Sequence, residues 1–287
     1  MRLRVFAAAT PAALALLVGA APAHARPAGG AAVDAPQVIP LPADTLKRLK
    51  SGDPAQIKSA LDDVRVSARA AAAAVPVVAE LLQRGLPEAL TQEAIDAIGD
   101  TESEAGAAAV AWYTRDRSPA IRRAAVSALA RTRGSAAVAA LRASLSDPDA
   151  GVRGLAATSL GSMKAKDAVR DLFVALEHRI DEAAASIGQL CAGAECDRLT
   201  GLLGSVAFDV VTGGLDQVLF RPASEVSDDL KIKIVDRLRE VGTGEAHRFL
   251  SDVQAKWPKG WSRKVKEAID RSVQATAASP GASGGAP

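Results

Sequence analysis

The two cysteines of the chain, Cys191 and Cys196, stand five positions apart. Redox dithiols usually have a C-x-x-C spacing, which this C-x4-C pair lacks. A zinc site would need two further ligands, and the neighbouring sequence supplies none. Two cysteines that meet an oxidising compartment form a disulfide. We therefore predict a structural disulfide between them, with a pair of free thiols as the alternative.

A second unusual stretch runs from Lys256 to Lys266 and reads KWPKGWSRKVK, with five cations, two tryptophans and no acidic residue. Aromatic rings among cations are typical of surfaces that bind nucleic acids, anionic lipids or glycans. The alternative is packing, because Trp261 falls on a repeated apolar stripe and Trp257 adjoins Pro258 in a connection between helices. The cations would then be solvated charges of a terminal helix.

Residues with catalytic potential are sparse. His178 and His247 are the only histidines beyond the predicted signal peptide described below, and no HExxH motif occurs. Gly213-Gly214 lacks the GxxxxGK[ST] spacing of a phosphate loop. The acidic stretch GDTESEAG, residues 99–106, is typical of a solvated turn with helix-capping residues. We predict no catalytic residue, no metal site and no cofactor.

The N-terminal stretch MRLRVFAAATPAALALLVGAAPAHA, which ends at Ala25, begins with two arginines, continues with an apolar segment and closes with the tripeptide AHA. This is the layout of a secretory signal peptide that is cleaved after Ala25. The apolar segment is interrupted by Pro11 and is shorter than the ~20 residues that cross a bilayer, so an uncleaved anchor is the less favoured alternative. We expect the mature protein in the periplasm or outside the cell, without a membrane span.

Charge and composition narrow the class of protein. The 287 residues include 35 lysines and arginines and 33 acidic residues, and removal of Arg2 and Arg4 with the signal peptide makes the two numbers equal. A neutral mature chain lacks the field typical of nucleic-acid binders, so we expect no nucleic-acid partner. Hydrophobic residues make up 48% and aromatic residues only 3%, which favours a helical core of alanine and aliphatic residues.

One helical pattern recurs along the chain. Each unit ends its apolar stripe at an aliphatic residue, which we call the anchor. Small or apolar residues stand four and eight positions before the anchor, and this spacing marks one stripe of an amphipathic helix. The anchors are Ile98, Leu129, Leu160, Ile187, Leu238 and Ile269. The first, second and last intervals between them are equal and define the repeat period, as from Ile98 to Leu129. Periods of roughly 20–50 residues indicate stacked supersecondary units.

The repeat is irregular in its second half. The third interval is four positions shorter than the repeat period, and Arg179 interrupts the apolar stripe of the fourth unit. The fourth interval, from Ile187 to Leu238, is twenty positions longer than the period. The fourth unit is therefore the least regular one, and it is followed by an insertion.

A second aliphatic residue follows twelve positions after each of the first five anchors. These residues are Val110, Leu141, Leu172, Leu199 and Leu250. A continuous helix would place each about 18 Å farther along and off the stripe. A turn and an antiparallel helix bring each pair to the same height instead. Prolines such as Pro119 and Pro148 mark where new helices begin. Each unit is therefore predicted to be an αα-hairpin.

The helix starts carry a family resemblance. The stretch SDPDAGVRG, residues 146–154, and the earlier Asp116, Pro119 and Arg122 resemble the Asp-Pro-x-x-x-Val-Arg starts of short HEAT-like repeats. The resemblance to the HEAT-repeat family covers roughly residues 51–273 and is strongest over 119–176. It implies an all-α fold, an α-solenoid of about six to seven stacked antiparallel helical hairpins with the second helices on a concave face. The family motif is structural and brings no catalytic residues.

These patterns divide the chain into a signal peptide (1–25), a flexible linker (26–43), a HEAT-like α-solenoid (44–273) and a disordered tail (274–287). The long fourth interval adds an insertion at 204–229, where we expect two short helices broken at Gly213-Gly214. Because the insertion is apolar, it either fills the solenoid or decorates one face as a partner-binding feature.

Residues that depart from the repeat are the candidates for partner binding, since aromatic side chains flanked by cations dominate interface energies. They are Phe208, Phe220, Arg221, Trp257, Lys259 and Trp261. We expect an exported, monomeric, non-catalytic scaffold that binds an unidentified protein in the bacterial envelope. One alternative is a binder of anionic lipid or polysaccharide through Lys256–Lys266. The other is a lyase-like enzyme, which a relationship to HEAT-like cofactor attachment proteins would imply.

The predicted cleavage is testable by intact-mass spectrometry and N-terminal sequencing of protein secreted by a bacterial host. The secreted chain is expected to begin at Arg26, because the small residues of AHA fit signal peptidase. A chain that keeps Met1 in the cytoplasm would contradict export. One that keeps Met1 and sediments with membranes would indicate the uncleaved anchor.

Overall fold

The computed structural model describes residues 38–277, and the predicted signal peptide lies outside them. Within this range the chain forms α-helices, short 3-10 helices and turns, and its one β-type contact is an isolated bridge between Leu203 and Val206. The α-helices are α1 (Thr45–Leu49), α2 (Pro54–Ser67), α3 (Val75–Arg84), α4 (Glu88–Asp100), α5 (Glu104–Ala111), α6 (Pro119–Arg131), α7 (Ser135–Ser144), α8 (Ala150–Ser162), α9 (Val169–Glu177), α10 (Glu182–Leu190), α11 (Ala194–Gly201), α12 (Phe208–Leu219), α13 (Asp228–Val241), α14 (Gly244–Lys256) and α15 (Arg263–Ala277).

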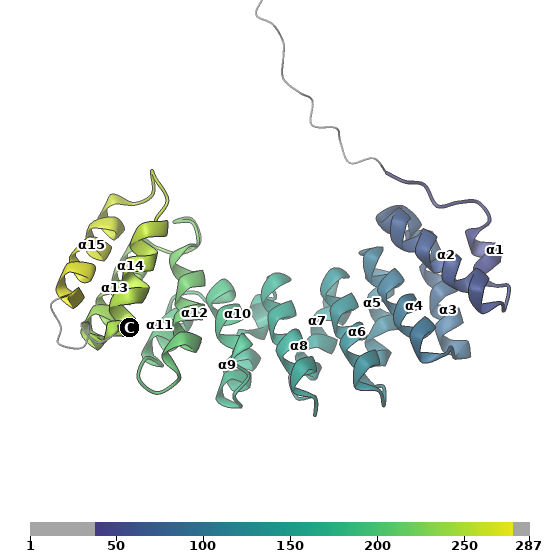
Figure 1. The fold of residues 1–287 in the computed structure, drawn as a ribbon, viewed down its shortest axis with the longest axis horizontal. Helices are drawn as coiled ribbons and strands as arrows, with labels where there is room; N and C mark the ends of the chain where they lie inside the picture. The colour runs from purple at the N-terminus through teal and green to yellow at the C-terminus, as the bar shows by residue number, and fades with distance from the viewer. Residues whose placement is uncertain (1–37, 278–287) are drawn as a thin grey trace, which may run out of the picture. The chain divides into compact units, whose positions relative to one another are not determined.

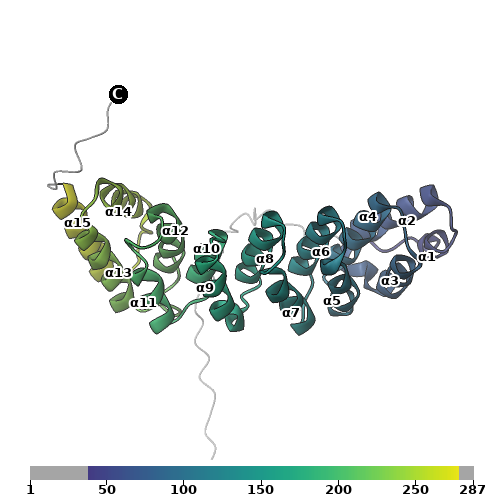
Figure 2. The same cartoon turned by 90° about the horizontal axis from the view of Figure 1, so that it is seen from below.

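The helices stack as pairs in a row (Figure 1). Over residues 38–277 the six pairs are α2/α3, α4/α5, α6/α7, α8/α9, α10/α11 and α13/α14. The first helices from α2 to α12 contact one another in order and form one layer, with the second helices from α3 to α11 on the other side (Figure 2). The all-α solenoid predicted from the repeat is confirmed.

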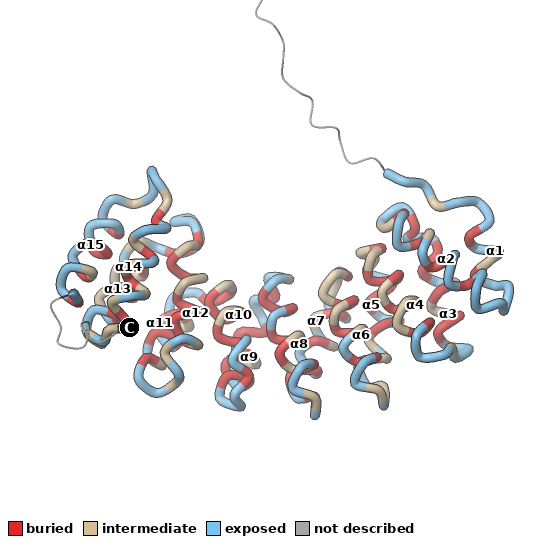
Figure 3. Tube along the Cα trace, viewed as in Figure 1, coloured by how far each residue is buried: buried red, intermediate tan, exposed pale blue. Residues whose placement is uncertain are grey.

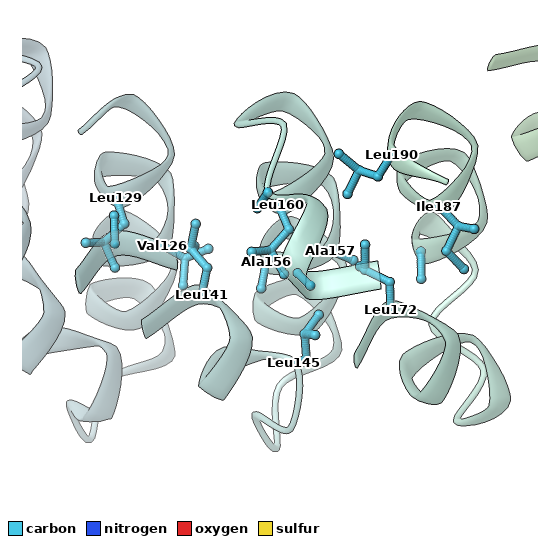
Figure 4. Packing of buried hydrophobic residues seen from close by; sticks show 14 of the residues in the cluster. Val126, Leu129, Leu141, Leu145, Ala156, Ala157, Leu160, Leu172, Ile187 and Leu190 are labelled. Atoms are coloured by element: carbon cyan, nitrogen blue, oxygen red, sulfur yellow. The ribbon is translucent and has the colours of Figure 1, made fainter. Parts of the chain in front are cut away.

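The apolar stripe forms the core, as the spacing predicts. All six anchors are buried, and so are the five aliphatic residues twelve positions later. Leu129 of α6 and Leu141 of α7 belong to the same continuous cluster (Figure 4). Buried residues follow the helices along the row, whereas exposed residues gather at the turns (Figure 3). Ala125 and Ala156, at the middle of the stripe, have no exposed surface, so each lets the next helix approach closely.

The Asp-Pro helix starts carry a buried ion pair between neighbouring hairpins. Arg122 of α6 donates two hydrogen bonds to the Asp147 carboxylate, at 2.8 and 2.9 Å. The same guanidinium donates to the carbonyl oxygens six and five positions before it, and Arg153 repeats this pattern one unit later. One repeat period after Asp147 the chain has His178, so the irregular fourth unit offers no equivalent carboxylate to Arg153.

The predicted insertion supplies a helix of the first layer. The expectation of two short helices broken at Gly213-Gly214 is wrong, because α12 runs unbroken from Phe208 to Leu219 and packs on α10. A β-carbon on Gly188 of α10 would collide with the carbonyl oxygen of Gly214. One on Gly214 would come 2.5 Å from the carbonyl oxygen of Ala184. The glycines therefore bring the two helix backbones into direct contact.

The disordered tail was predicted to begin at residue 274, but α15 continues to Ala277. Residues 274–277 are helical because Thr276 is buried and its hydroxyl lies 3.0 Å from Nδ1 of His247 on α14. The expectation of a disordered tail is therefore wrong for this last turn of α15.

The stretch Pro54–Arg84 is long and apolar enough to cross a membrane by length and composition alone. Core helices of a repeat protein meet the same criterion. This stretch consists of α2, α3 and the 3-10 segment between them, and Ala68 breaks the α-helical geometry at a φ of 47°. Lys58 and Arg65 on α2 form ion pairs with Glu93 and Asp100 of α4, as expected for helices stacked within the solenoid.

Two glycine substitutions test the contact between α10 and α12. Gly188→Ala is expected to lower the free energy of unfolding by about 3 kcal/mol, because the new methyl group meets backbone that cannot move aside. Gly213→Ala is the matched control, since its methyl group meets nothing within 4 Å, and it is expected to add about 0.5–1 kcal/mol of helix stability. Urea denaturation followed by circular dichroism measures both. A similar loss in the two variants would contradict the unbroken α12.

Candidate functional site

Three of the predicted partner-binding residues, Phe220, Trp257 and Trp261, form one aromatic cluster. Phe220 follows α12, and the two tryptophans lie in the connection between α14 and α15. The ring centroid of Trp257 lies 5.9 Å from that of Phe220 and 5.4 Å from that of Trp261, with the tryptophans edge to face. Trp257 is buried and Phe220 half-buried, whereas Trp261 is 36% exposed. Trp261 is thus the most exposed ring of the cluster.

The cluster holds the ammonium group of a buried lysine. Lys231 of α13 is 2% exposed, and its Nζ donates to the carbonyl oxygen of Arg221. The same Nζ lies 4.8 Å from the ring centroid of Trp261 and 5.6 Å from that of Trp257, within the range of cation–π attraction. Burial lowers the pKa of Lys231, while the charge of Asp228 opposes this shift.

Arg221 connects this cluster to the fourth hairpin. Its buried guanidinium donates to the carbonyl oxygen of Cys191 at 2.7 Å, at the C-terminal end of α10, and pairs with Glu225 at 3.1 Å. Cys191 is joined to Cys196 by a disulfide, as the sequence predicts, which ties the end of α10 to the first turn of α11. Arg221 therefore positions backbone, and a direct contact with a partner stays a prediction.

The two remaining candidates lie on either side of this arrangement. Lys259 is exposed in the same connection, two positions before Trp261. Phe208 begins α12, packs partly against the core, and stands twelve positions before Phe220, about 18 Å along the helix. The structure therefore brings three of the predicted residues together as rings, with Lys259 in the same connection, Arg221 buried directly after Phe220 in the chain, and Phe208 apart.

A second exposed tryptophan, Trp112, was not predicted. It is 75% exposed in the 3-10 helix that follows α5, and it borders a groove of about 420 Å³. The groove is lined by Ala79, Leu82, Gln83, Ala108, Ala109, Trp112 and Tyr113. The hydroxyl of Tyr113 donates to the carbonyl oxygen of Leu82 at 2.9 Å and fixes this edge to α3. Its position in the sequence, just after the stripe residue Val110, could have identified Trp112 as a candidate.

Most other shifted pKa values belong to ion pairs that join neighbouring hairpins. A hydrogen bond from Arg123 lowers the pKa of Asp149, and one from Arg69 lowers the pKa of Glu102. Burial raises the pKa of Asp216 on α12. Within residues 38–277, no group of three or more His, Cys, Asp or Glu side chains is placed to hold a metal ion.

Lys231→Met tests the energetic role of the buried ammonium group. The variant is expected to be as stable as the parent at pH 7 or more stable by about 1–2 kcal/mol, because methionine fills the space without a buried charge. Lys231→Ala is the control and is expected to lose about 2 kcal/mol through the cavity that it leaves. Urea denaturation measures both variants.

The pH dependence of the same variants gives the sign of the pKa shift. A lysine whose pKa is lower in the folded state binds a proton more weakly there, so the parent should gain stability as pH rises from its folded pKa toward 10.5. Lys231→Met should lack this gain, and its advantage should shrink with rising pH. An advantage that grows with pH would contradict the assignment.

The comparison with protein families agrees with the repeat pattern over part of the chain. Residues 75–154 match the family model for HEAT repeats. None of the curated proteins matches the chain. Among solved structures, the complex of CpcE and CpcF of phycocyanin lyase from Nostoc sp. PCC7120 is similar over 86% of this chain and 98% of that chain, with 16% identity and a TM-score of 0.45. A designed armadillo repeat protein is similar over 81% and 98%, with 15% identity and a TM-score of 0.38. The family match coincides with the hairpins from α3 to the start of α8, so this part of the chain consists of HEAT repeats.

Proposed function

We propose that this HEAT-repeat chain is an exported, non-catalytic scaffold that binds another protein of the bacterial envelope through the surface around Trp261. The observation that carries the proposal is the position of this ring, which is 36% exposed although Trp257 and Lys231 support it from below. A rigid, partly exposed tryptophan is the residue type that dominates interface energies.

The support beneath Trp261 favours binding because the ring is already ordered before a partner arrives. An ordered anchor loses little side-chain entropy when it is covered, so more of its burial energy appears as affinity. Lys259 stands exposed in the same turn, and Lys264 is exposed in the first turn of α15. Cations around an aromatic anchor favour a partner with acidic residues around its own binding pocket.

Export rests on the N-terminal pattern, and the disulfide supports it. Cys191 and Cys196 are bonded to each other, and disulfides persist mainly in oxidising compartments such as the periplasm.

Among the side chains of the aromatic cluster, the amine of Lys231 is the group most suited to act as a nucleophile or base. It is enclosed by rings and bound to a backbone oxygen, which gives the lyase-like alternative less support than a binding surface.

A second candidate function is adhesion to anionic lipid or polysaccharide. The exposed Lys259 and Lys264 beside Trp261 favour it, because an interfacial tryptophan with lysines is typical of membrane-surface binding. Such adhesion would weaken steeply between low and physiological salt, whereas a protein interface centred on Trp261 would weaken less.

Capture of envelope proteins by the mature chain tests the proposal. Trp261→Ala and Lys259→Glu are expected to reduce the yield of the main co-purified protein at least tenfold by quantitative mass spectrometry, because both residues lie on the proposed surface. Val66→Ala, on exposed surface of α2, is the matched control and should leave the yield unchanged. Circular dichroism checks that each variant folds.

Equal capture by parent and both variants would refute this binding surface. Binding of the parent to phosphatidylglycerol vesicles, lost in the same variants and at physiological salt, would favour the adhesion alternative.

A further inference from the structure

We propose that a cationic groove on the edge of the solenoid, remote in sequence from Trp261, binds an acidic peptide segment of a protein partner. The groove lies at the turns that connect α6 to α7 and α8 to α9, and its volume is about 980 Å³. The proposal rests on the proposed scaffold function and adds a second contact with stated partner chemistry. The side chains that carry it are Arg133, Val138, Met163, Lys164 and Lys166.

The charges that line the groove are predominantly positive, with five cations against two carboxylates. Arg131 and Arg142 are already paired with acidic residues outside the groove. Lys164 and Lys166 are exposed and form no ion pair with any residue of the described range 38–277.

Arg133 is the third cation of the rim. With 72% of its side chain exposed, it lies 3.6 Å from Glu102, a carboxylate that Arg69 also holds. A carboxylate shared between two arginines, at this longer distance, holds Arg133 only weakly. Three cations, Arg133, Lys164 and Lys166, are therefore available to carboxylates of a partner.

The repeat fixes the spacing of these cations. Glu102, Arg133 and Lys164 stand one repeat period apart and occupy the same turn of successive hairpins. Packed helices lie about 8–10 Å apart, and a peptide in the polyproline II conformation advances about 3.1 Å per residue with three residues per turn. Carboxylates at every third position of such a peptide share one face and therefore match Arg133 and Lys164.

The floor of the groove is apolar. Val138 and Ala139 come from α7, and Met163 follows α8. An apolar side chain between the acidic residues of a peptide would cover these groups, and a methionine adapts to different shapes. An acidic peptide with leucines fits this combination of a charged rim and an apolar floor better than a simple anion would.

Lys164 follows α8 in a left-handed backbone conformation, which Glu102 and Arg179 also adopt. Lys164 has a φ of 57°, and the N–H of Ala165 donates to the carbonyl oxygen of Leu160, the pattern of a helix end that favours glycine. A lysine in this left-handed conformation costs stability that glycine would not. Of these residues, Lys164 is the one that brings a cation to the groove lining.

This conformation provides a clean variant. Lys164→Gly removes the cation and suits the backbone, so its melting temperature is expected to equal or exceed that of the parent. Arg179→Gly is the matched control, because Arg179 is also an exposed cation at a helix end, with a φ of 64°, but lies outside the groove.

Fluorescence anisotropy with labelled peptides measures the binding to the full mature chain. The probes are EELEELEEL and its neutral counterpart QQLQQLQQL. The parent is expected to bind the acidic peptide at least tenfold more tightly than the neutral one, with a strong salt dependence. Lys164→Gly should raise the Kd of the acidic peptide at least fivefold, whereas Arg179→Gly should change it less than twofold.

Equal affinity for the two peptides, or equal losses in the two glycine variants, would overturn the groove assignment. Lys164-dependent binding to phosphatidylglycerol vesicles without binding to the peptide would overturn it in favour of a lipid surface. Trp261→Ala separates the two proposals, because it should leave acidic-peptide binding unchanged. If the peptide does not bind but envelope capture still depends on Trp261, the groove fails and the proposed function stands.

Discussion

Each helical pair of this protein hides its apolar stripe only by stacking against the next pair, so the whole structure depends on how closely neighbouring helices approach. Small residues set that distance. Alanines such as Ala125 and Ala156 allow the close row from α4 to α10, and the Gly188–Gly214 contact brings α10 and α12 together at backbone distance. Loss of the apolar stripe of one pair would expose the stripes of both neighbouring pairs, because the hydrophobic core of residues 38–277 consists of the contacts between stacked units.

The row changes character after α12, where large side chains replace small ones. Lys231, Phe220 and Trp257 fill the junction between α12 and the last helices, and the bond from Arg221 to the end of α10 extends the connection to the disulfide-closed turn. The rings of this junction are buried to different extents, and Trp261 stays 36% exposed at the surface. The candidate binding surface thus lies where the helix supplied by the insertion meets the last helices.

The solenoid could be predicted because its information is periodic. Anchors that keep one period in three of their five intervals, with aliphatic residues twelve positions after the first five, leave few arrangements other than stacked hairpins, and the anchors are buried as that spacing requires. The predicted helix break at Gly213-Gly214 was wrong because glycine commonly breaks helices. The contact that explains Gly214 comes from Gly188 on another helix, which the local sequence does not reveal. Lys231 reads as one more solvated cation, and only the meeting of α13 with the connection at Trp257 buries it. The repeat period predicts which residues lie in the stripe. It does not predict the surroundings of side chains that are buried by segments distant in the sequence.

In a solenoid, the surface residues available for binding are more distinct from the residues that stabilise the fold than they are in a globular domain. Turn positions such as Arg133 and Lys164 recur once per unit but lie outside the stripe, so their charges can change without disturbing the stacked core. A chain whose predicted mature form is electrically neutral can then still carry a strongly cationic edge over two hairpins and an aromatic anchor at another. If both proposed surfaces contact one partner, the stacked row holds them at a high effective concentration toward it, which is a physical advantage of so plain a repeat.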